Sequence, residues 1–183
     1  TGATVKTVIL EHEYASPAKE VWAVATDLDA LREIMDGIVS FEGLPSGRVY
    51  QGQRITVQVS LFGKLPPQPY FMEVLECDDE AMILRSSEKG AGVKSWRHTL
   101  TVEPQQSGSR LRDVIEIDAG WMSWAFGLWA RFLYRKRHEP RVQMLADLRA
   151  KRSETGLSVR AAVGVLDLHR DVRPKRRDDG QTG

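Results

Sequence analysis

The sequence predicts an α+β fold in which a curved antiparallel sheet of about seven strands wraps around a long C-terminal helix, with two short helices after the first strand. Three observations lead to this prediction. One strand-like segment and two short helical segments open the chain, six strand-like segments follow without a helix between them, and residues 121–151 are helical throughout. Because the strands and helices are grouped rather than alternating, the pattern favours α+β over a parallel α/β arrangement.

The first strand and the two short helices are predicted from residues 5–37. Val5 to Tyr14 alternates apolar and polar side chains and is rich in β-branched residues, as strands are. Ser16 is expected to cap the first helix, because Pro17 after it suits a first helical position. The second helix is expected to end near Gly37, and its apolar residues recur at helical spacing: Leu28, Leu31, Ile34 and Met35.

Six further strands are predicted between residues 39 and 118. Their expected bounds are 39–44, 53–62, 70–76, 82–87, 95–102 and 110–118. Turn-forming segments such as Gly63 to Pro67 and Gly90 to Gly92 separate them. Strands at such short intervals indicate an antiparallel meander, since a parallel pair needs a longer crossover connection.

The long helix is predicted from Trp121 to Lys151, with Pro140 as a kink or break. We expect a single ligand-binding domain over residues 1–154 and a basic C-terminal extension over residues 155–183. Within this extension, residues 157–168 are compatible with a short amphipathic helix, and residues 172–183 are expected to be disordered.

Composition indicates a soluble protein with one core. The chain has 183 residues, of which 42% are hydrophobic and 28% are charged, so it can bury one sizeable core. Cys77 is the only cysteine, which excludes an intrachain disulfide and favours a reducing compartment. Residues 1–15 lack the basic flank and apolar run of a signal peptide. We therefore predict a cytoplasmic location.

The net charge of +1 hides an uneven distribution along the chain. Residues 131–183 contain 14 Lys and Arg residues and 7 Asp and Glu residues, so this part is basic. Residues 1–130 contain 12 Lys and Arg residues and 18 Asp and Glu residues, so this part is acidic. Such a basic end fits an anionic partner, although charge runs are more often solvated faces. Nucleic acid is not expected as a partner, because the basic run from Arg173 to Arg177 is short and lacks interleaved aromatic residues.

No cofactor or metal site is predicted. The histidines are far apart in the sequence, and neither a His-Glu-x-x-His nor a Cys-x-x-Cys pattern occurs. The glycines around Ala91 are not followed by the Lys and Ser or Thr of a phosphate-binding loop. Covalent catalysis is also not expected, because no serine lies in a nucleophile-elbow turn and Cys77 has acidic neighbours.

Three stretches of the chain resemble the SRPBCC superfamily. They are residues 16–22 (SPAKEVW), the paired segments 95–102 and 109–116, and residues 132–138 (FLYRKRH). This superfamily includes lipid-transfer START domains, the birch-pollen allergen family and polyketide cyclase/dehydrase-like proteins, and the chain is similar to its bacterial ligand-binding subgroup. The resemblance covers about residues 4–150. It implies the helix-grip fold with a cavity between sheet and helix, and leaves the chemistry open.

Strand alternation predicts which side chains face this cavity, since every second side chain of a strand lies on the same face. The predicted ligand-binding residues are Val57, Val59, Tyr70, Met72, Arg85, Trp96, His98, Leu100, Asp113, Ile115, Phe126 and Trp129. The polar members of this set are expected to orient the polar end of a ligand. A buried polar group without a partner costs about 1–3 kcal/mol, so these groups need either each other or a ligand.

His98 and Asp113 are predicted to lie near each other, because one hairpin joins their strands. An aspartate that fixes the tautomer of a histidine leaves the second ring nitrogen free to bind or protonate a ligand oxygen. The pair is therefore the candidate catalytic pair of an enzyme. The alternative is that the two side chains only satisfy each other and fix the register of their strands.

The leading functional hypothesis is binding or transport of a small hydrophobic ligand, such as a lipid, isoprenoid, polyketide or aromatic compound, without catalysis. The alternative is a metal-free polyketide cyclase or dehydratase that uses His98 and Asp113 as general acid and base. A second alternative is peripheral membrane association. The helix is apolar around nearly its whole circumference from Trp121 to Tyr134, so its outer face is expected to be covered by other parts of the chain, to form a homodimer, or to contact a membrane.

Overall fold

The computed structural model describes residues 5–168 and the side chains of residues 5–155. By packing, the chain divides into two units, residues 1–145 and residues 146–183. Along the described chain the elements are β1 (Lys6–Tyr14), α1 (Ala18–Ala25), α2 (Leu28–Ile34), β2 (Val39–Glu42), β3 (Arg54–Leu61), β4 (Gln68–Asp78), β5 (Ile83–Gly90), β6 (Val93–Gln105), β7 (Gly108–Asp118), the 3-10 helix η1 (Gly120–Met122), α3 (Ser123–Lys136) and α4 (His138–Leu168).

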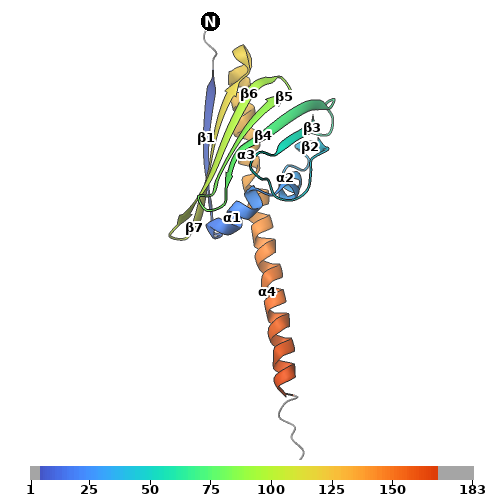
Figure 1. The fold of residues 1–183 in the computed structure, drawn as a ribbon, viewed down its shortest axis with the longest axis vertical. Coiled ribbons are helices and arrows are strands. Elements are labelled where there is room, and N and C mark those ends of the chain that lie inside the picture. Colours follow the sequence, from blue (N-terminus) through green and yellow to red (C-terminus); the bar gives the residue numbers. More distant parts are fainter. Residues whose placement is uncertain (1–4, 169–183) are drawn as a thin grey trace, which may run out of the picture. The chain divides into compact units, whose positions relative to one another are not determined.

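The strands form one antiparallel sheet in the order β1-β7-β6-β5-β4-β3-β2 (Figure 1). From β2 to β7, each strand pairs with the strand that follows it in the sequence, as a meander does. β1 pairs with β7 along its whole length, from Lys6 opposite Ile117 to Tyr14 opposite Ser109. The predicted α+β fold is confirmed: a seven-stranded antiparallel sheet, two short helices after the first strand and a long C-terminal helix.

Two details of the helices differ from the sequence prediction. Pro17, not Ser16, is the N-cap residue of α1, and no side chain caps this helix. The Ser16 carbonyl instead accepts a hydrogen bond of 2.9 Å from the Ser109 hydroxyl, which ties the chain to β7. The predicted long helix is interrupted at Arg137, so that Pro140 falls in the first turn of α4, where its missing N–H removes no helical hydrogen bond.

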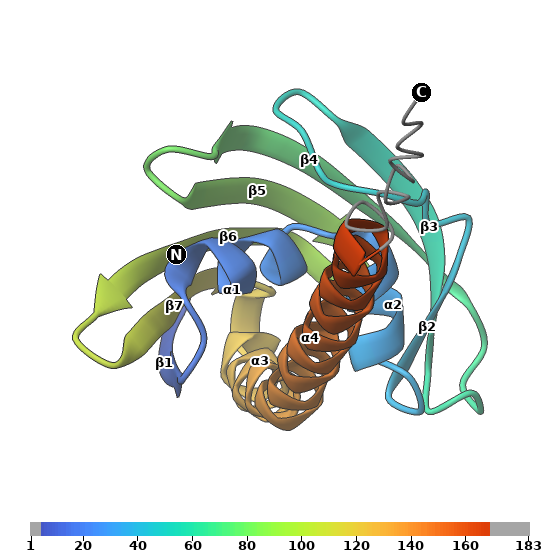
Figure 2. The same ribbon diagram turned by 90° about the horizontal axis from the view of Figure 1, so that it is seen from below.

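The helices lie inside the curve of the sheet, as Figure 2 shows for α1, α2 and α3. α3 makes its main sheet contacts with β1 and β7, and α1 makes its contacts with β6 and β7. The helices therefore cover the half of the concave face that contains β1 and β7.

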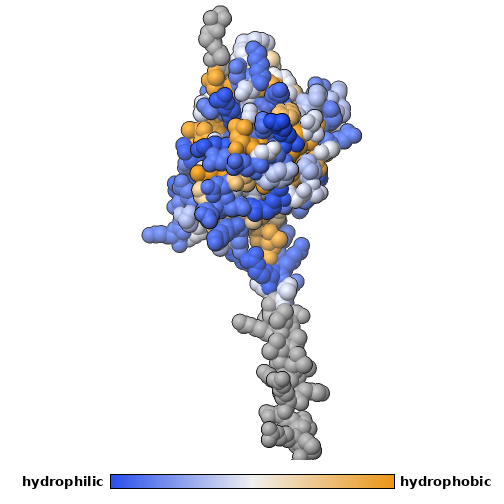
Figure 3. All heavy atoms as spheres, in the orientation of Figure 1, coloured by the Kyte–Doolittle hydropathy of each residue, from blue (hydrophilic) through white to orange (hydrophobic). Residues whose placement is uncertain are grey.

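Alternation along the strands gives the sheet one buried face. On β7 the buried residues are Ser109, Leu111, Asp113, Ile115 and Ile117. On β3 they are Ile55, Val57 and Val59. These are the faces that the sequence predicts to point inward, because side chains two positions apart lie on the same side of a strand. On the face shown in Figure 3, the outside of residues 5–145 is a mixture of polar areas and smaller apolar ones.

Helix α4 belongs partly to each packing unit, with residues 138–145 in the first unit. Residues 157–168 are helical, as the sequence predicts, but they continue α4 rather than forming a separate helix. The domain boundary predicted at residue 154 stays a prediction, and the disorder predicted for residues 172–183 lies outside the described residues. No helix within residues 5–168 combines the length and apolar character that crossing a bilayer requires.

The β6–β7 hairpin depends on a glycine that approaches β1 closely. Gly108 has a φ of 129°, and a Cβ at this position would overlap the backbone carbonyl oxygen of Tyr14. We expect Gly108→Ala to lower the free energy of unfolding by about 1–3 kcal/mol more than a control glycine substitution, because strain and a backbone clash combine. Urea denaturation measures this difference.

Gly37→Ala is the matched control, since Gly37 also has a positive φ of 76° but a Cβ there meets nothing within 4 Å. Equal unfolding midpoints for the two variants would show that the close approach to β1 does not constrain the hairpin.

Candidate functional site

A cavity of about 450 Å³ lies between the sheet and the helices of the first unit. Its walls come from the inner faces of the strands β2 to β6, from α1, α2 and α3, and from the first turn of α4. Neither β1 nor β7, both of which the structure describes in full, contributes a lining residue. The lining is mostly aliphatic and aromatic. This volume lies within the range of about 300–1,000 Å³ that is usual for small-molecule sites.

Most of the predicted ligand-binding residues line this cavity. They are Val57, Val59, Tyr70, Met72, Trp96, His98, Leu100, Phe126 and Trp129. The strand residues are there because β3 to β6 turn alternate side chains inward. Phe126 and Trp129 lie one turn apart on α3, on the side that faces these strands.

Three predicted residues do not line the cavity. Asp113 and Ile115 are buried on the inner face of β7, but α3 packs on this strand, so they lie in the core beside the cavity. Arg85 is exposed and forms an ion pair of 2.7 Å with Glu76. Its neighbour Ser86 is the inward residue of β5, which places Arg85 on the outer face.

His98 and Asp113 form a buried pair with 2.7 Å between Nε2 of the histidine and Oδ1 of the aspartate. Burial opposes ionisation of Asp113, but the hydrogen bond to His98 and the nearby guanidinium groups lower the pKa of its carboxyl. An ionised carboxylate only accepts hydrogen bonds, so Nε2 of His98 carries the shared proton. In a neutral imidazole, Nδ1 is then the ring nitrogen left to accept a hydrogen bond, and His98 is one of the residues that line the cavity.

A second polar cluster centres on Glu88, which the sequence analysis missed. The Tyr70 hydroxyl donates to Oε2 of Glu88 at 2.6 Å, and the Ser86 hydroxyl donates to Oε1 at 2.7 Å. Burial, together with the Glu88 carboxylate, raises the pKa of Tyr70 well above its usual value, so the phenol remains a donor. The expected strand 82–87 ends three residues before β5 does and therefore leaves out Glu88. Alternation continued from Leu84 and Ser86 would have placed Glu88 inward.

Tyr134 is a third polar group on the wall that sequence reasoning missed. The Tyr134 ring lies edge-on to the His98 ring, with 5.0 Å between the ring centroids. The guanidinium carbon of Arg137 lies 4.1 Å from the centroid of the Tyr134 ring. Burial raises the pKa of the Tyr134 phenol, which therefore stays protonated at neutral pH. Tyr134 connects the strand side of the cavity with the end of α3.

Arg137 and Arg141 also line the cavity, although they belong to the basic end of the chain, which the sequence predicts to be solvated or to face an anionic partner. Arg141 is buried, and its Nη1 donates to the Tyr14 hydroxyl at 3.0 Å. The sequence signal that places both arginines on one helix face with Tyr134 is their spacing: Arg137 follows Tyr134 by three residues, and Arg141 follows Arg137 by four.

The cavity opens at the end of the sheet where β3 leads into β4. Only four of its lining residues are exposed: Leu65, Pro66, Gln68 and Met122. The first three belong to the β3–β4 connection and the start of β4, and Met122 belongs to η1. Among the described residues, no group of three or more His, Cys, Asp or Glu is arranged to hold a metal ion.

The fold is shared with solved structures of low sequence identity. Norcoclaurine synthase from Thalictrum flavum in complex with dopamine and hydroxybenzaldehyde matches with a TM-score of 0.61 and 17% identity over 79% of this chain and 88% of the other. Ara h 8.0201 matches with a TM-score of 0.61 and 12% identity over 78% of this chain and 99% of the other. Protein CV1439 from Chromobacterium violaceum matches with a TM-score of 0.62 and 16% identity over 76% of this chain and 96% of the other. At such identities the likeness establishes the helix-grip fold alone.

No curated protein matches the chain. A family model does match it: the model described as polyketide cyclase / dehydrase and lipid transport aligns with residues 6–148. This range contains every strand, α1, α2, α3 and the first part of α4, and hence the whole cavity wall. The resemblance to the SRPBCC superfamily is confirmed, and the chain belongs to the polyketide cyclase/dehydrase and lipid transport family.

Proposed function

We propose that the protein binds a small hydrophobic ligand in the cavity between the sheet and α3, and carries it without chemical change. The observation that supports this proposal most directly is the cavity itself, about 450 Å³ with mostly apolar walls. Burial of apolar surface contributes about 25 cal/mol per Å², so an apolar molecule enclosed by these walls gains affinity without specific polar contacts. A cytoplasmic location is part of this proposal.

The kind of ligand follows from the shape of the wall. Aliphatic residues of β3 and β4 face Phe126 and Trp129 of α3 across the cavity, so an elongated chain or a flat ring system is enclosed on both sides. Lipids, isoprenoids, polyketides and aromatic compounds all meet this requirement. Norcoclaurine synthase, which has a similar fold, is known with dopamine and hydroxybenzaldehyde, and these aromatic compounds fit the same general class.

The second candidate function is a cyclase or dehydratase, and the buried pair of His98 and Asp113 favours it. His98 lines the cavity, and its Nδ1 is placed to take a proton from a bound ligand while Asp113 stabilises the resulting imidazolium. A proton transfer of this kind needs neither a metal nor a nucleophile.

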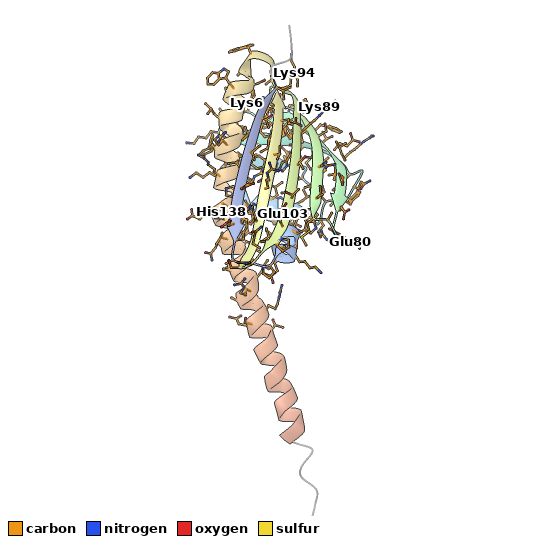
Figure 4. All side chains as sticks on the ribbon, turned by 90° about the vertical axis from the view of Figure 1, so that its left-hand side faces the viewer. Lys6, Glu80, Lys89, Lys94, Glu103 and His138 are labelled. Carbon is orange, nitrogen blue, oxygen red and sulfur yellow. The ribbon has the colours of Figure 1, made fainter. Side chains whose placement is uncertain are left out.

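The third candidate is contact with a membrane at the opening of the cavity. Exposed apolar side chains lie in the segments that border the opening, namely the β3–β4 connection, η1 and the first two turns of α3. We name them the mouth patch: Phe62, Leu65, Trp121, Met122, Trp124 and Leu128. Trp121 is 82% exposed. Lys6, Lys89 and Lys94 lie at the same end of the sheet (Figure 4). The ammonium group of Lys94 lies beside Gly120, the first residue of η1, since a Cβ on this glycine would be 3.8 Å from Nζ. Aromatic residues beside lysines suit an anionic lipid surface.

Filling the cavity tests the carrier proposal. Val57→Phe places a ring in the cavity, and we expect it to weaken binding of the uncharged probe N-phenyl-1-naphthylamine at least about tenfold, which corresponds to about 1.4 kcal/mol. Gln58→Phe is the matched control, because Gln58 is the exposed neighbour of Val57 on the outer face of β3. The affinity of this variant for the probe should change less than about twofold. Titration of the probe measures both affinities.

Equal affinity of Val57→Phe and the unchanged protein would place the probe outside the cavity. A wild-type protein that neither binds the probe nor retains a small molecule in native mass spectrometry would also overturn the carrier proposal.

His98→Ala separates the carrier from the enzyme. For a carrier, we expect weaker affinity for the ligand that native mass spectrometry identifies, about two- to tenfold, because one polar contact is lost, and no conversion of this ligand by the wild-type protein. Mass spectrometry of the ligand after incubation measures conversion. Conversion by the wild-type protein that His98→Ala abolishes while affinity is kept would establish the enzyme instead.

Sedimentation with lipid vesicles tests the mouth patch. We expect the wild-type protein to sediment with vesicles of phosphatidylcholine and phosphatidylglycerol more than with phosphatidylcholine alone, and the double variant Trp121→Ser and Trp124→Ser to bind at least about fivefold more weakly, since interfacial tryptophans are lost. Leu75→Ser, which removes an exposed apolar residue of β4 far from the opening, is the control.

Unchanged sedimentation of the double variant would contradict membrane contact. So would a wild-type dimer in light scattering that the same double variant converts to a monomer, because the patch would then join two copies of the chain.

A further inference from the structure

One end of the cavity carries two positive charges that form no ion pair with the side chains of residues 5–155. Arg137 and Arg141 are four residues apart across the junction of α3 and α4, and both line the cavity. Arg141 is only 4% exposed. A charge removed from water in this way is costly unless it is paired or hydrogen-bonded. A partner for these guanidinium groups is therefore expected.

The contacts of Arg141 leave part of its guanidinium without a partner. Nη1 donates to the Tyr14 hydroxyl at 3.0 Å, but the buried Nε has no hydrogen-bond partner in the described part of the chain. Burial raises the pKa of Tyr14, so its hydroxyl is a neutral acceptor rather than a counter-ion. Within residues 5–155, Arg141 takes part in no ion pair.

Arg137 is likewise held by neutral groups. Its Nε donates to Sδ of Met35 at 3.2 Å, and its guanidinium stacks on the Tyr134 ring at 4.1 Å. A thioether is a weak acceptor, and an aromatic face attracts a cation without neutralising it. Arg137 is also absent from the ion pairs of the described side chains.

The acidic groups in and beside the cavity wall have partners elsewhere. Both oxygens of Glu88 accept from the hydroxyls of Tyr70 and Ser86, and Asp27 caps α2 by accepting from the Ala30 N–H at 2.8 Å. Asp113, in the core beside the cavity, is hydrogen-bonded to His98. Asp113 lies near enough to both arginines for their charges to lower its pKa, but it does not reach ion-pair distance. The cavity thus has satisfied carboxylates and an unsatisfied cationic end.

Two histidines lie behind this cationic end. His12 and His138 stack with 4.9 Å between their ring centroids, and His138 also contacts the Tyr14 ring. Burial and the charge of Arg141 lower the pKa of His138, so this ring is mostly neutral at pH 7 and adds no further positive charge beside Arg141. An imidazole supplies no negative charge, so neither histidine neutralises Arg141.

A second N–H donor of the cavity wall comes from β6. Nε1 of Trp96 is buried, and among the described side chains it meets no acceptor at full hydrogen-bond geometry. It does lie close enough to the Tyr134 hydroxyl to oppose the rise in the pKa of that phenol, and 6.5 Å separates the two ring centroids. The unmatched donor at the cationic end is therefore Nε of Arg141, which suits a ligand group that accepts hydrogen bonds.

From this geometry we propose that the ligand is an anionic amphiphile whose carboxylate or phosphate is bound by Arg141 and Arg137, while its apolar body lies against β3, β4 and α3. Guanidinium groups bind both anions through charge-assisted, often bidentate hydrogen bonds. Glu88 faces the same cavity from the strand side and repels an anion there, which directs the headgroup toward the arginines. This inference rests on the proposed carrier function and specifies the class of its ligand.

Three probes with the same ten-carbon chain test the charge: decanoate, decyl phosphate and 1-decanol, each measured by isothermal titration calorimetry at pH 7. We expect at least one of the two anions to bind at least about tenfold more tightly than the alcohol. The comparison of decanoate with decyl phosphate shows which headgroup the arginines prefer. Equal affinity for all three would overturn the inference and leave the carrier function standing, whereas no binding of any probe would contradict the carrier function itself.

Variants of the arginines assign the effect to these side chains. Arg137→Gln and Arg141→Gln should weaken binding of the preferred anion at least about fivefold and change 1-decanol binding less than twofold. Arg135→Gln is the control, since Arg135 is exposed on the same helix and does not line the cavity.

An equal loss of anion and alcohol binding in Arg137→Gln would indicate a purely structural role and overturn the assignment. Circular dichroism checks the fold of each variant. If Arg141→Gln does not fold, Arg137→Gln alone gives the result, because Arg137 is only partly buried and its removal breaks no ion pair.

Discussion

The structure depends on the off-centre packing of α3 within the curved sheet. α3 contacts β1 and β7, which closes the inner face of these strands with protein atoms. β3, β4 and β5 curve past the helix, and their inward side chains meet a cavity instead of a second layer. One alternation of side chains thus builds a packed core on one half of the sheet and a ligand wall on the other.

The polar groups of this wall are divided between the sheet and the helices. The strands bring carboxylates together with their own donors, so that Glu88 and Asp113 are satisfied within the protein. The α3–α4 junction brings guanidinium groups without matching carboxylates. An apolar cavity with one cationic end is an environment in which charge, and not only size, contributes to the choice of ligand.

Most of the fold could be predicted because its signals are local: turn residues mark each strand end, and alternation marks the buried face. The site required information that no local pattern contains. Asp113 and Ile115 have the predicted orientation, but whether a residue borders the cavity depends on where α3 crosses the sheet. Arg85 lies one position from the inward Ser86. Arg137 and Arg141 belong to a basic run, which is typical of a solvated or membrane-facing surface, and only the packing of the helix ends places them at the cavity.

The cavity wall is contributed by segments that are separate in the sequence. Residues 55–74 of β3 and β4 supply much of its apolar lining, and residues 134–141 supply its cationic end. Substitutions in the first segment alter the length and width of the molecule that fits, while substitutions in the second alter the headgroup that is tolerated. Shape selectivity and charge selectivity can therefore diverge independently among descendants of such a chain, each through a handful of mutations that leave the other untouched.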